Sequence, residues 1–329
     1  KANSLVEIGD VAFYDTDLGG TLVIPAKVTT IGDFAFSNTK LGGLDLSKAT
    51  SLVEIGEFAF ILTNLEGTLA IPSTVTTIGN DAFANTKLTY LDLSEATSLV
   101  EIGEGALADT DLAGLLKVGP AVKIIGTSAF ASTKLTGLDL SDATSLVEIG
   151  EFAFLGSTDL AGALKVGPAV KTIGASAFAN TKLTYLDLSE ATSLVEIGKS
   201  AFSETNLAGT LMIPSTVTKI GPDAFYYTGL TGLDLSKATS LVEIGDRAFL
   251  GATNLAGTLA VPNTVTTIGT GAFANTKLDL FANTNLDLSK ATSPYYGTPT
   301  SPYGRLVHLA QEAGTYPVLV SPGMLAAVL

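Results

Sequence analysis

The motif Ser-Leu-Val-Glu-Ile-Gly recurs along the chain, and a second Ile-Gly pair lies between successive copies. From Ile8 to Ile268, the isoleucines of these motifs follow one another at intervals of 23 or 24 residues. Aliphatic residues at fixed positions with a period in the twenties predict a solenoid, in which each unit forms one coil. Two kinds of unit alternate, so we expect about twelve stacked coils arranged as modules of two coils each.

Each unit contains two extended segments, as judged from the alternation of apolar and variable residues. The longer segment covers 88–93 in one kind of unit and 207–213 in the other, where Pro214 ends it. A period of two predicts a strand with one buried face, and proline removes a donor from the hydrogen-bond ladder. The Val-x-x-Ile-Gly stretch predicts a shorter extended segment. The Ala-Phe stretch that follows predicts one or two short helical turns.

A phenylalanine occupies the same position in every unit except one, where Leu107 replaces it. Identical side chains in consecutive coils can stack, so we expect a buried spine in which each ring contributes about 1.5–3 kcal/mol. An aromatic cage for a ligand would not recur in every unit, so the column is interpreted as core. It consists of Phe13, Phe36, Phe60, Phe83, Phe130, Phe154, Phe178, Phe202, Phe225, Phe249 and Phe273.

These repeating residues resemble the BspA-like leucine-rich repeats of the Treponema pallidum class. Units of that family run Leu-x-x-Leu-x-Leu-Pro-x-x-Leu-x-x-Ile-Gly-x-x-Ala-Phe-x-x-Cys, and the Ile-Gly-x-x-Ala-Phe signature recurs in nearly every unit of residues 1–293. The resemblance implies an α/β-type leucine-rich repeat solenoid with a parallel sheet on its concave face. It also implies an extracellular or cell-surface module for adhesion and protein interaction, without catalytic residues.

Threonine stands where that family often has cysteine. We expect the hydroxyl groups of this column to hydrogen-bond the backbone of a neighbouring coil. The residues are Thr39, Thr86, Thr133, Thr181, Thr228 and Thr276.

The composition disfavours several classes of function. The chain of 329 residues carries 32 Asp and Glu against 18 Lys and Arg, a net charge of −14 that disfavours binding to nucleic acid or an anionic membrane. No apolar run approaches the roughly 18 residues that a membrane-spanning helix needs. The absence of cysteine excludes disulfide bonds, cysteine-based zinc sites and thiol catalysis. We therefore expect neither a metal nor a cofactor.

The repeat becomes irregular at both ends of the chain. The first nine residues match 48–56 closely, so the chain begins in the middle of a unit and we expect a further coil upstream in the natural protein. Residues 1–293 form the predicted solenoid, and 294–329 begin with a Pro/Tyr/Gly-rich linker. The apolar segment 305–329 is either a cap over the last coil, which an open solenoid end needs, or a docking segment for a partner.

Outward residues of the long strands form the candidate binding site. Near the end of each strand, one residue is expected to point toward the concave face. In coil order these residues give a column of alternating charge, Asp92, Lys117, Asp139, Lys165 and Asp187. Strand neighbours about 5 Å apart can pair with each other, at about 0.2–1 kcal/mol per pair. The column either neutralises a repulsive row of aspartates or, with Tyr90 and Tyr185 beside it, grips a glycan or an extended protein segment.

A catalytic alternative uses the same column. Asp139 could act as acid or base while Lys117 or Lys165 polarises a sugar carboxylate, as in a solenoid lyase or hydrolase acting on polysaccharides. A catalytic site should be a unique break in the repeat, whereas these residues recur with it. The sequence therefore predicts a non-enzymatic interaction or adhesion scaffold for a protein or glycan partner. The second hypothesis is a structural subunit that docks into a larger assembly through 305–329.

Overall fold

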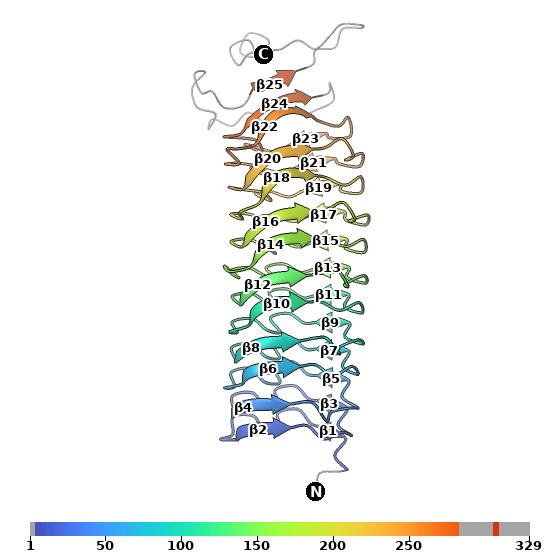
Figure 1. The fold of residues 1–329 in the computed structure, drawn as a ribbon, viewed down its shortest axis with the longest axis vertical. Coiled ribbons are helices and arrows are strands. Elements are labelled where there is room, and N and C mark those ends of the chain that lie inside the picture. Colours follow the sequence, from blue (N-terminus) through green and yellow to red (C-terminus); the bar gives the residue numbers. More distant parts are fainter. Residues whose placement is uncertain (1–3, 283–304, 309–329) are drawn as a thin grey trace.

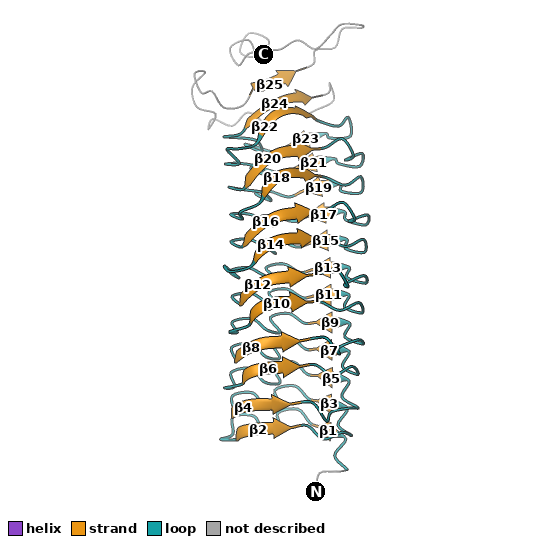
Figure 2. Ribbon diagram, in the orientation of Figure 1, coloured by secondary structure: helices purple, strands orange, loops and turns teal. Residues whose placement is uncertain are grey.

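The computed structural model describes residues 4–282 and 305–308. The chain winds into coils stacked along one axis, from β1 near the N-terminus to β24 and β25 (Figure 1). Each coil contributes one long and one short strand, and Figure 2 shows that the rest of each coil is loop and turn. The expected solenoid of about twelve coils is confirmed, and it forms a nearly straight column in Figure 1.

The short strands form one continuous parallel sheet along the column. Each has two residues, and all twelve follow one another in chain order. In each strand the second residue is a buried isoleucine that pairs with the isoleucine of the next coil, as Ile125 does with Ile149. These strands are β1 (Glu7–Ile8), β3 (Thr30–Ile31), β5 (Glu54–Ile55), β7 (Thr77–Ile78), β9 (Glu101–Ile102), β11 (Ile124–Ile125), β13 (Glu148–Ile149), β15 (Thr172–Ile173), β17 (Glu196–Ile197), β19 (Lys219–Ile220), β21 (Glu243–Ile244) and β23 (Thr267–Ile268).

The long strands have five or six residues and pair in parallel only within a module. The expected concave sheet of long strands is thus interrupted between modules. The pairs are β2 (Gly19–Val23) with β4 (Lys40–Asp45), β6 (Glu66–Ala70) with β8 (Lys87–Asp92), β10 (Ala113–Lys117) with β12 (Lys134–Asp139), β14 (Ala161–Lys165) with β16 (Lys182–Asp187), β18 (Ala208–Met212) with β20 (Gly229–Asp234), and β22 (Ala256–Ala260) with β24 (Lys277–Ala282).

The last long strand has a further neighbour. β25 (Arg305–His308) pairs with β24 in parallel, with Arg305 as the backbone partner of Asp279. The predicted linker over 294–304 and the remainder of the predicted cap, 309–329, lie outside the described residues.

A bulge interrupts the register of the paired long strands. In β10, Gly114 has a φ of +79°, and the register with β12 shifts between Gly114 and Leu115. Glycine adopts this conformation without steric cost, and a bulge bends the strand and disrupts the ladder locally. The same shift occurs in β2, β6, β14 and β18. The register is therefore irregular within a module, and pairing is absent between modules.

The expected helical turns do not form, since residues 4–282 and 305–308 contain no helix. In one Ala-Phe turn, Ser128 and Ser132 have φ values of +54° and +56°, far from the negative φ of a right-handed helix. The backbone N–H groups of Ser128, Phe130 and Ser132 each donate to a carbonyl of the next coil at 2.8 Å. Because these donors bond between coils, they cannot make the i−4 bonds of an α-helix.

The predicted phenylalanine spine is confirmed. Successive rings lie 5.1–5.5 Å apart between centroids, with interplanar angles of 2–8°. Leu107, also buried, separates Phe83 from Phe130. Phe154 is fully buried, whereas Phe13 in the first coil stacks on one ring and remains 42% exposed. The offset, near-parallel geometry is favourable for aromatic pairs.

The threonine column is buried, but its hydrogen bonds differ from the expected pattern. Each hydroxyl donates to the carbonyl of the phenylalanine three residues earlier in the same coil, at 2.7–3.1 Å, because the tight turn brings that carbonyl within reach. Ser157 occupies the same place in its coil, and its hydroxyl lies 3.0 Å from the carbonyl of Phe130 in the preceding coil. Bonding to a neighbouring coil is therefore the exception in this column. The column mainly closes each turn on itself.

The glycine of each Ile-Gly pair determines how closely two coils approach. A Cβ atom at Gly126 would lie 2.6 Å from the carbonyl carbon of Gly103 and 2.7 Å from the nitrogen of Glu104. Those backbone atoms cannot move aside without breaking the hydrogen bonds between coils. Glycine is therefore required here for close approach of the backbones.

Replacing Phe154 with alanine is expected to lower the free energy of unfolding by about 3–5 kcal/mol, because it removes a buried ring between two others. The matched variant Phe13→Ala should cost less than about half as much, because that ring is partly exposed and stacks on one side. Urea titration followed by circular dichroism measures both losses. Equal losses would contradict a spine stabilised by burial.

Changing Gly126 to alanine is expected to destabilise the fold by about 1–3 kcal/mol, because the added methyl group overlaps the neighbouring backbone. Gly9 occupies the same place in the first coil, where a Cβ atom would meet nothing within 4 Å. Gly9→Ala should therefore stay within about 0.5 kcal/mol of the parent chain. Thermal unfolding of the two variants distinguishes this steric cause from a general effect of losing glycine.

Candidate functional site

The outward side chains of the long strands form a surface that we call the long-strand face. Apolar residues that point inward, such as Leu88 and Leu91 of β8, anchor each strand to the core. The outward positions differ from coil to coil. Large exposed apolar side chains occur there at Val23, Tyr90, Leu115, Tyr185 and Met212.

The predicted charge column divides into separate sets. Lys117 is the backbone partner of Asp139 in the β10–β12 pair, and Lys165 is the partner of Asp187 in the β14–β16 pair. Asp92 pairs with Ala70 of β6 and belongs to a different sheet from Lys117. The structure therefore places two lysines opposite two aspartates on paired strands. It does not form a continuous ladder of alternating charge.

The lysines do not form their ion pairs with the aspartates of the column, which corrects the expected cross-strand pairing. Lys117 Nζ lies 2.8 Å from Asp142 Oδ2, and Lys165 Nζ lies 2.8 Å from Glu190 Oε1. The hydrogen bond and charge of Asp142 raise the pKa of Lys117, and those of Glu190 raise the pKa of Lys165. A long, flexible lysine reaches beyond its strand neighbour to the loop of the next coil. Both pairs are exposed, so they contribute little to stability.

The aspartates are held by their own coils. Asp139 Oδ1 accepts the backbone N–H of Ser141 at 2.9 Å, and Asp187 Oδ1 accepts that of Ser189 at the same distance. Hydrogen bonds from the Ser141 side chain and backbone lower the pKa of Asp139, and the positive charge of Lys117 adds less. The carboxylates are therefore fixed in their ionised form by local bonds.

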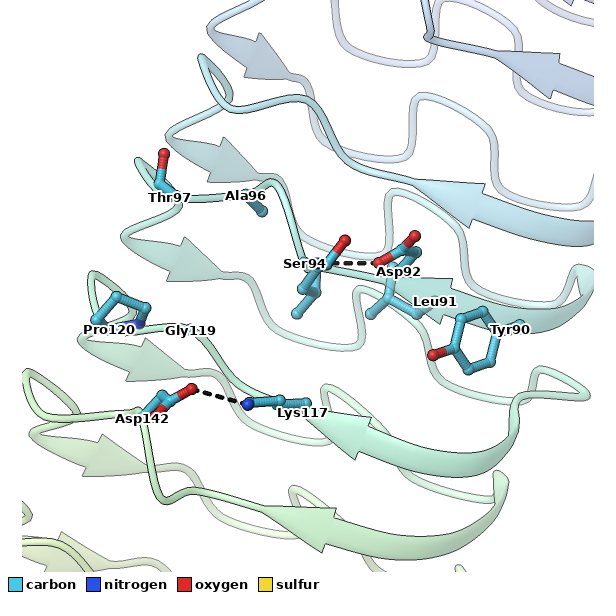
Figure 3. Close-up of a pocket in the computed structure, with 11 residues that line it drawn as sticks. Tyr90, Leu91, Asp92, Ser94, Ala96, Thr97, Lys117, Gly119, Pro120 and Asp142 are labelled. Atoms are coloured by element: carbon cyan, nitrogen blue, oxygen red, sulfur yellow. Dashed lines mark hydrogen bonds and ion pairs between the residues drawn. The ribbon is translucent and has the colours of Figure 1, made fainter.

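A hollow of about 270 Å³ lies between the coils of β8 and β10, and we call it the Tyr90 hollow (Figure 3). Three of the seven predicted site residues, Tyr90, Asp92 and Lys117, line it. In Figure 3 the Tyr90 ring lies at one end with its hydroxyl directed inward, and the ion pair between Lys117 and Asp142 runs along the β10 side. On the β8 side, Asp92 Oδ1 accepts the N–H of Ser94 at 2.9 Å.

The hollow forms where two modules meet. β8 and β10 belong to different two-stranded sheets, so no ladder draws them together. Gly119 also lines the hollow, and a Cβ atom there would meet only the carbonyl oxygen of Ala96, at 3.8 Å. The missing side chain at Gly119 therefore leaves space that another residue would fill.

Within the described residues, the five junctions between modules carry four different residue pairs at the two positions that frame the hollow. Only the β8/β10 junction combines a tyrosine with a lysine. In order along the chain, the residue pairs at these junctions are Gly43 with Ala70, Tyr90 with Lys117, Gly137 with Lys165, Tyr185 with Met212, and Gly232 with Ala260.

Tyr185 belongs to another junction. It lies in β16, four coils along the stack from the coil of β8, and it faces the module that contains Met212. Residues 86–103 and 181–198 have the same sequence. The two tyrosines are therefore equivalent within their coils and differ in the coil that follows.

Three residues of the face escaped the sequence analysis. Leu115 is 54% exposed and stands where four equivalent strands carry threonine, so a break in the repeat could have identified it. Asp142 and Glu190 are the partners of the two lysines. They lie three residues beyond the strand aspartates, and nothing in the strand register points to them.

Two further kinds of site concern metal ions and membranes. Among the described residues, no group of three or more His, Asp or Glu side chains could hold a metal ion. The same residues contain no helix that is long and apolar enough to cross a membrane.

Removing the Ser141 hydroxyl in Ser141→Ala is expected to raise the pKa of Asp139 toward its ordinary value of 3.8, and by more than Lys117→Met raises it. Because the folded-state pKa is lowered, this bond stabilises the fold above the ordinary pKa and the contribution is lost as the pH falls through the folded value. Carboxyl-carbon NMR titration of the two variants measures the shifts. A larger effect of Lys117→Met would restore the cross-strand pairing that the structure corrects.

Comparisons with known proteins agree with this architecture. The sequence profile of the BspA type leucine-rich repeat region matches residues 2–113, 95–194, 123–256 and 171–288. A leucine-rich repeat protein from Bacteroides ovatus superposes with a TM-score of 0.65 at 24% identity, over 85% of this chain and 72% of that one.

Two further structures are more distant. The pneumococcal vaccine antigen PcpA gives a TM-score of 0.46 at 19% identity, over 81% of this chain and 69% of that one. A leucine-rich cell surface protein from Faecalibacterium prausnitzii gives 0.35 at 20% identity, over 83% of each chain. No curated protein matches the sequence. Because the family profile covers most of the chain, the protein belongs to the BspA-type leucine-rich repeat family.

Proposed function

We propose that the chain is a non-enzymatic scaffold that binds a macromolecular partner through its long-strand face. One observation carries the proposal: side chains that the coil does not need for packing are exposed on this face and vary from module to module. Tyr90, Leu115 and Tyr185 expose between 44% and 54% of their surface. Tyrosine is among the usual anchors of interfaces.

The contrast with the core supports this proposal. The isoleucine and phenylalanine columns recur from coil to coil because each coil must fit its neighbour. The junction positions of the long-strand face are free of that demand, and they carry glycine, alanine, tyrosine, lysine or methionine. Concave or flat repeat surfaces of this kind bind extended partners in other solenoids.

The state of Asp139 supports a binding role over the catalytic alternative. A general acid needs a raised pKa, whereas hydrogen bonds from Ser141 lower the pKa of Asp139. Asp142 and Glu190 offset the positive charges of Lys117 and Lys165, the lysines proposed to polarise a substrate. A lowered carboxyl pKa and paired lysines suit residues of a binding surface.

Family membership supports a place at the cell surface and a role in adhesion. BspA-like repeats, which the repeating residues of this chain resemble, are surface modules for adhesion. The acidic surface, with a net charge of −14, favours partners that are neutral or basic.

Surface plasmon resonance against a panel of purified extracellular-matrix proteins and mucins tests the proposal. We expect saturable binding to a member of the panel, and an affinity at least about tenfold lower for the double variant Tyr90→Ala/Tyr185→Ala. The matched control is Val195→Ser/Val242→Ser, since both valines are 45% exposed and lie beside the short-strand sheet. It should bind like the parent chain.

Two outcomes would contradict the proposal. One is binding that survives the tyrosine changes and disappears with the valine changes. The other is a chain that binds no member of the panel and sediments as a stable larger assembly, as the structural-subunit hypothesis requires.

A further inference from the structure

We propose that the Tyr90 hollow binds one neutral sugar ring of a glycan partner. This inference rests on the proposed function and names a ligand class for one part of the long-strand face. Its basis is the charges, the aromatic ring and the size of the hollow, together with the difference between this junction and the four others.

The charges in the hollow favour a neutral ligand. Lys117 supplies one positive charge, and Asp92 and Asp142 supply two negative charges around the same space. An anion meets two carboxylates, and a cation must compete with Lys117, which is already paired with Asp142. A sugar hydroxyl both donates and accepts, so it can bond to the ammonium group and the carboxylates at once.

The charged groups of the hollow can form further hydrogen bonds. Asp92 accepts the N–H of Ser94 through one oxygen, Oδ1. Each carboxylate offers about four acceptor positions, and an ammonium group offers three donors. Both members of the Lys117–Asp142 pair keep more than half of their side-chain surface exposed. Hydroxyl groups can therefore join this pair without displacing it.

An aromatic ring and a proline lie at the two ends of the site. Tyr90 is 44% exposed and lies at one end of the hollow, with Pro120 near the other end (Figure 3). The C–H face of a pyranose ring is apolar and packs on an aromatic face, while its hydroxyl groups project at the rim. Tyrosine suits this role because it has an apolar body and a polar tip.

The size of the hollow suits one ring. Its volume of about 270 Å³ lies just below the range of about 300–1,000 Å³ that is usual for small-molecule pockets. The hollow opens on the long-strand face, so adjoining sugars can continue along the exposed surface, where Leu115 of the same strand as Lys117 is also exposed.

The other junctions provide built-in comparisons. The β16/β18 junction has Tyr185 but Met212 in place of lysine, and the β12/β14 junction has Lys165 but Gly137 in place of tyrosine. Neither combines the ring with the ammonium group. The sequence around Tyr185 is the same as that around Tyr90, so the two junctions differ in the residue that the next coil supplies.

Gly119→Leu blocks the hollow. Its Cβ atom would have ordinary contact with Ala96, so the added side chain causes no backbone clash and extends into the space that glycine leaves. Gly167 holds the equivalent place in the next module, where a Cβ atom would meet the carbonyl oxygen of Ala143 at 3.9 Å. Gly167→Leu is therefore the matched control for folding and surface hydrophobicity.

An array of immobilised neutral oligosaccharides of glucose, galactose, mannose and N-acetylglucosamine is the first probe, with oligogalacturonate and oligolysine as acidic and basic counter-probes. The strongest neutral oligosaccharide is then titrated by isothermal calorimetry. We expect Tyr90→Ala and Gly119→Leu to weaken binding at least about tenfold, and Gly167→Leu to stay within about twofold of the parent chain.

Three results would overturn the inference: no neutral oligosaccharide binds, a counter-probe binds more strongly, or sugar binding survives Gly119→Leu. Partner binding in the surface plasmon resonance assay distinguishes failure of this inference from failure of the proposed function. If the panel protein binds and no sugar does, the sugar inference alone fails. If a sugar binds in the Tyr90 hollow and the tyrosine changes leave partner binding intact, the proposed function fails as stated and the sugar site stands.

Discussion

Hydrogen bonding between successive coils is the constraint on which the structure depends. In each Ile-Gly turn, alternate N–H groups donate to the next coil, and the turn glycine lets the two backbones approach that closely. This fixes the spacing at which side chains of neighbouring coils meet, so the phenylalanine rings stack at 5.1–5.5 Å throughout the spine. A residue in the interior must fit its own coil and the coils on both sides. The interior columns therefore repeat almost without change.

The same constraint leaves the outer surface free. A solenoid is stabilised by each coil and its immediate neighbours, and the outward positions of the long strands take no part in that packing. The long strands add a second freedom, because they pair within a module and leave a junction between modules. The interior is thus continuous along the column while the long-strand face is divided. Each junction can carry its own pair of side chains without changing the fold.

The sequence predicts the interior well and the surface poorly, for a physical reason. Periodic apolar residues directly determine burial, so the number of coils, the short strands and the phenylalanine spine follow from spacing alone. The turns are different: Ser128 and Ser132 have positive φ because their N–H groups bond to another coil, and no local pattern marks that partner. Lys117 bonds to Asp142 and not to its strand neighbour Asp139, because a flexible side chain is not confined to the register. The Tyr90 hollow depends on which strands pair, because it lies between two long strands of different sheets.

Duplication of a module repeats the coil, whereas a change at a junction alters only the side chains that meet there. The two identical segments 86–103 and 181–198 place Tyr90 and Tyr185 in equivalent positions, yet their surroundings differ because Lys117 follows one and Met212 follows the other. A change at such a position alters the chemistry of one junction and leaves the hydrogen bonds, the spine and the glycine contacts intact. A change at an interior position disturbs three coils at once. Selection for binding can therefore act on the junctions of the long-strand face while selection for stability keeps the interior columns nearly constant.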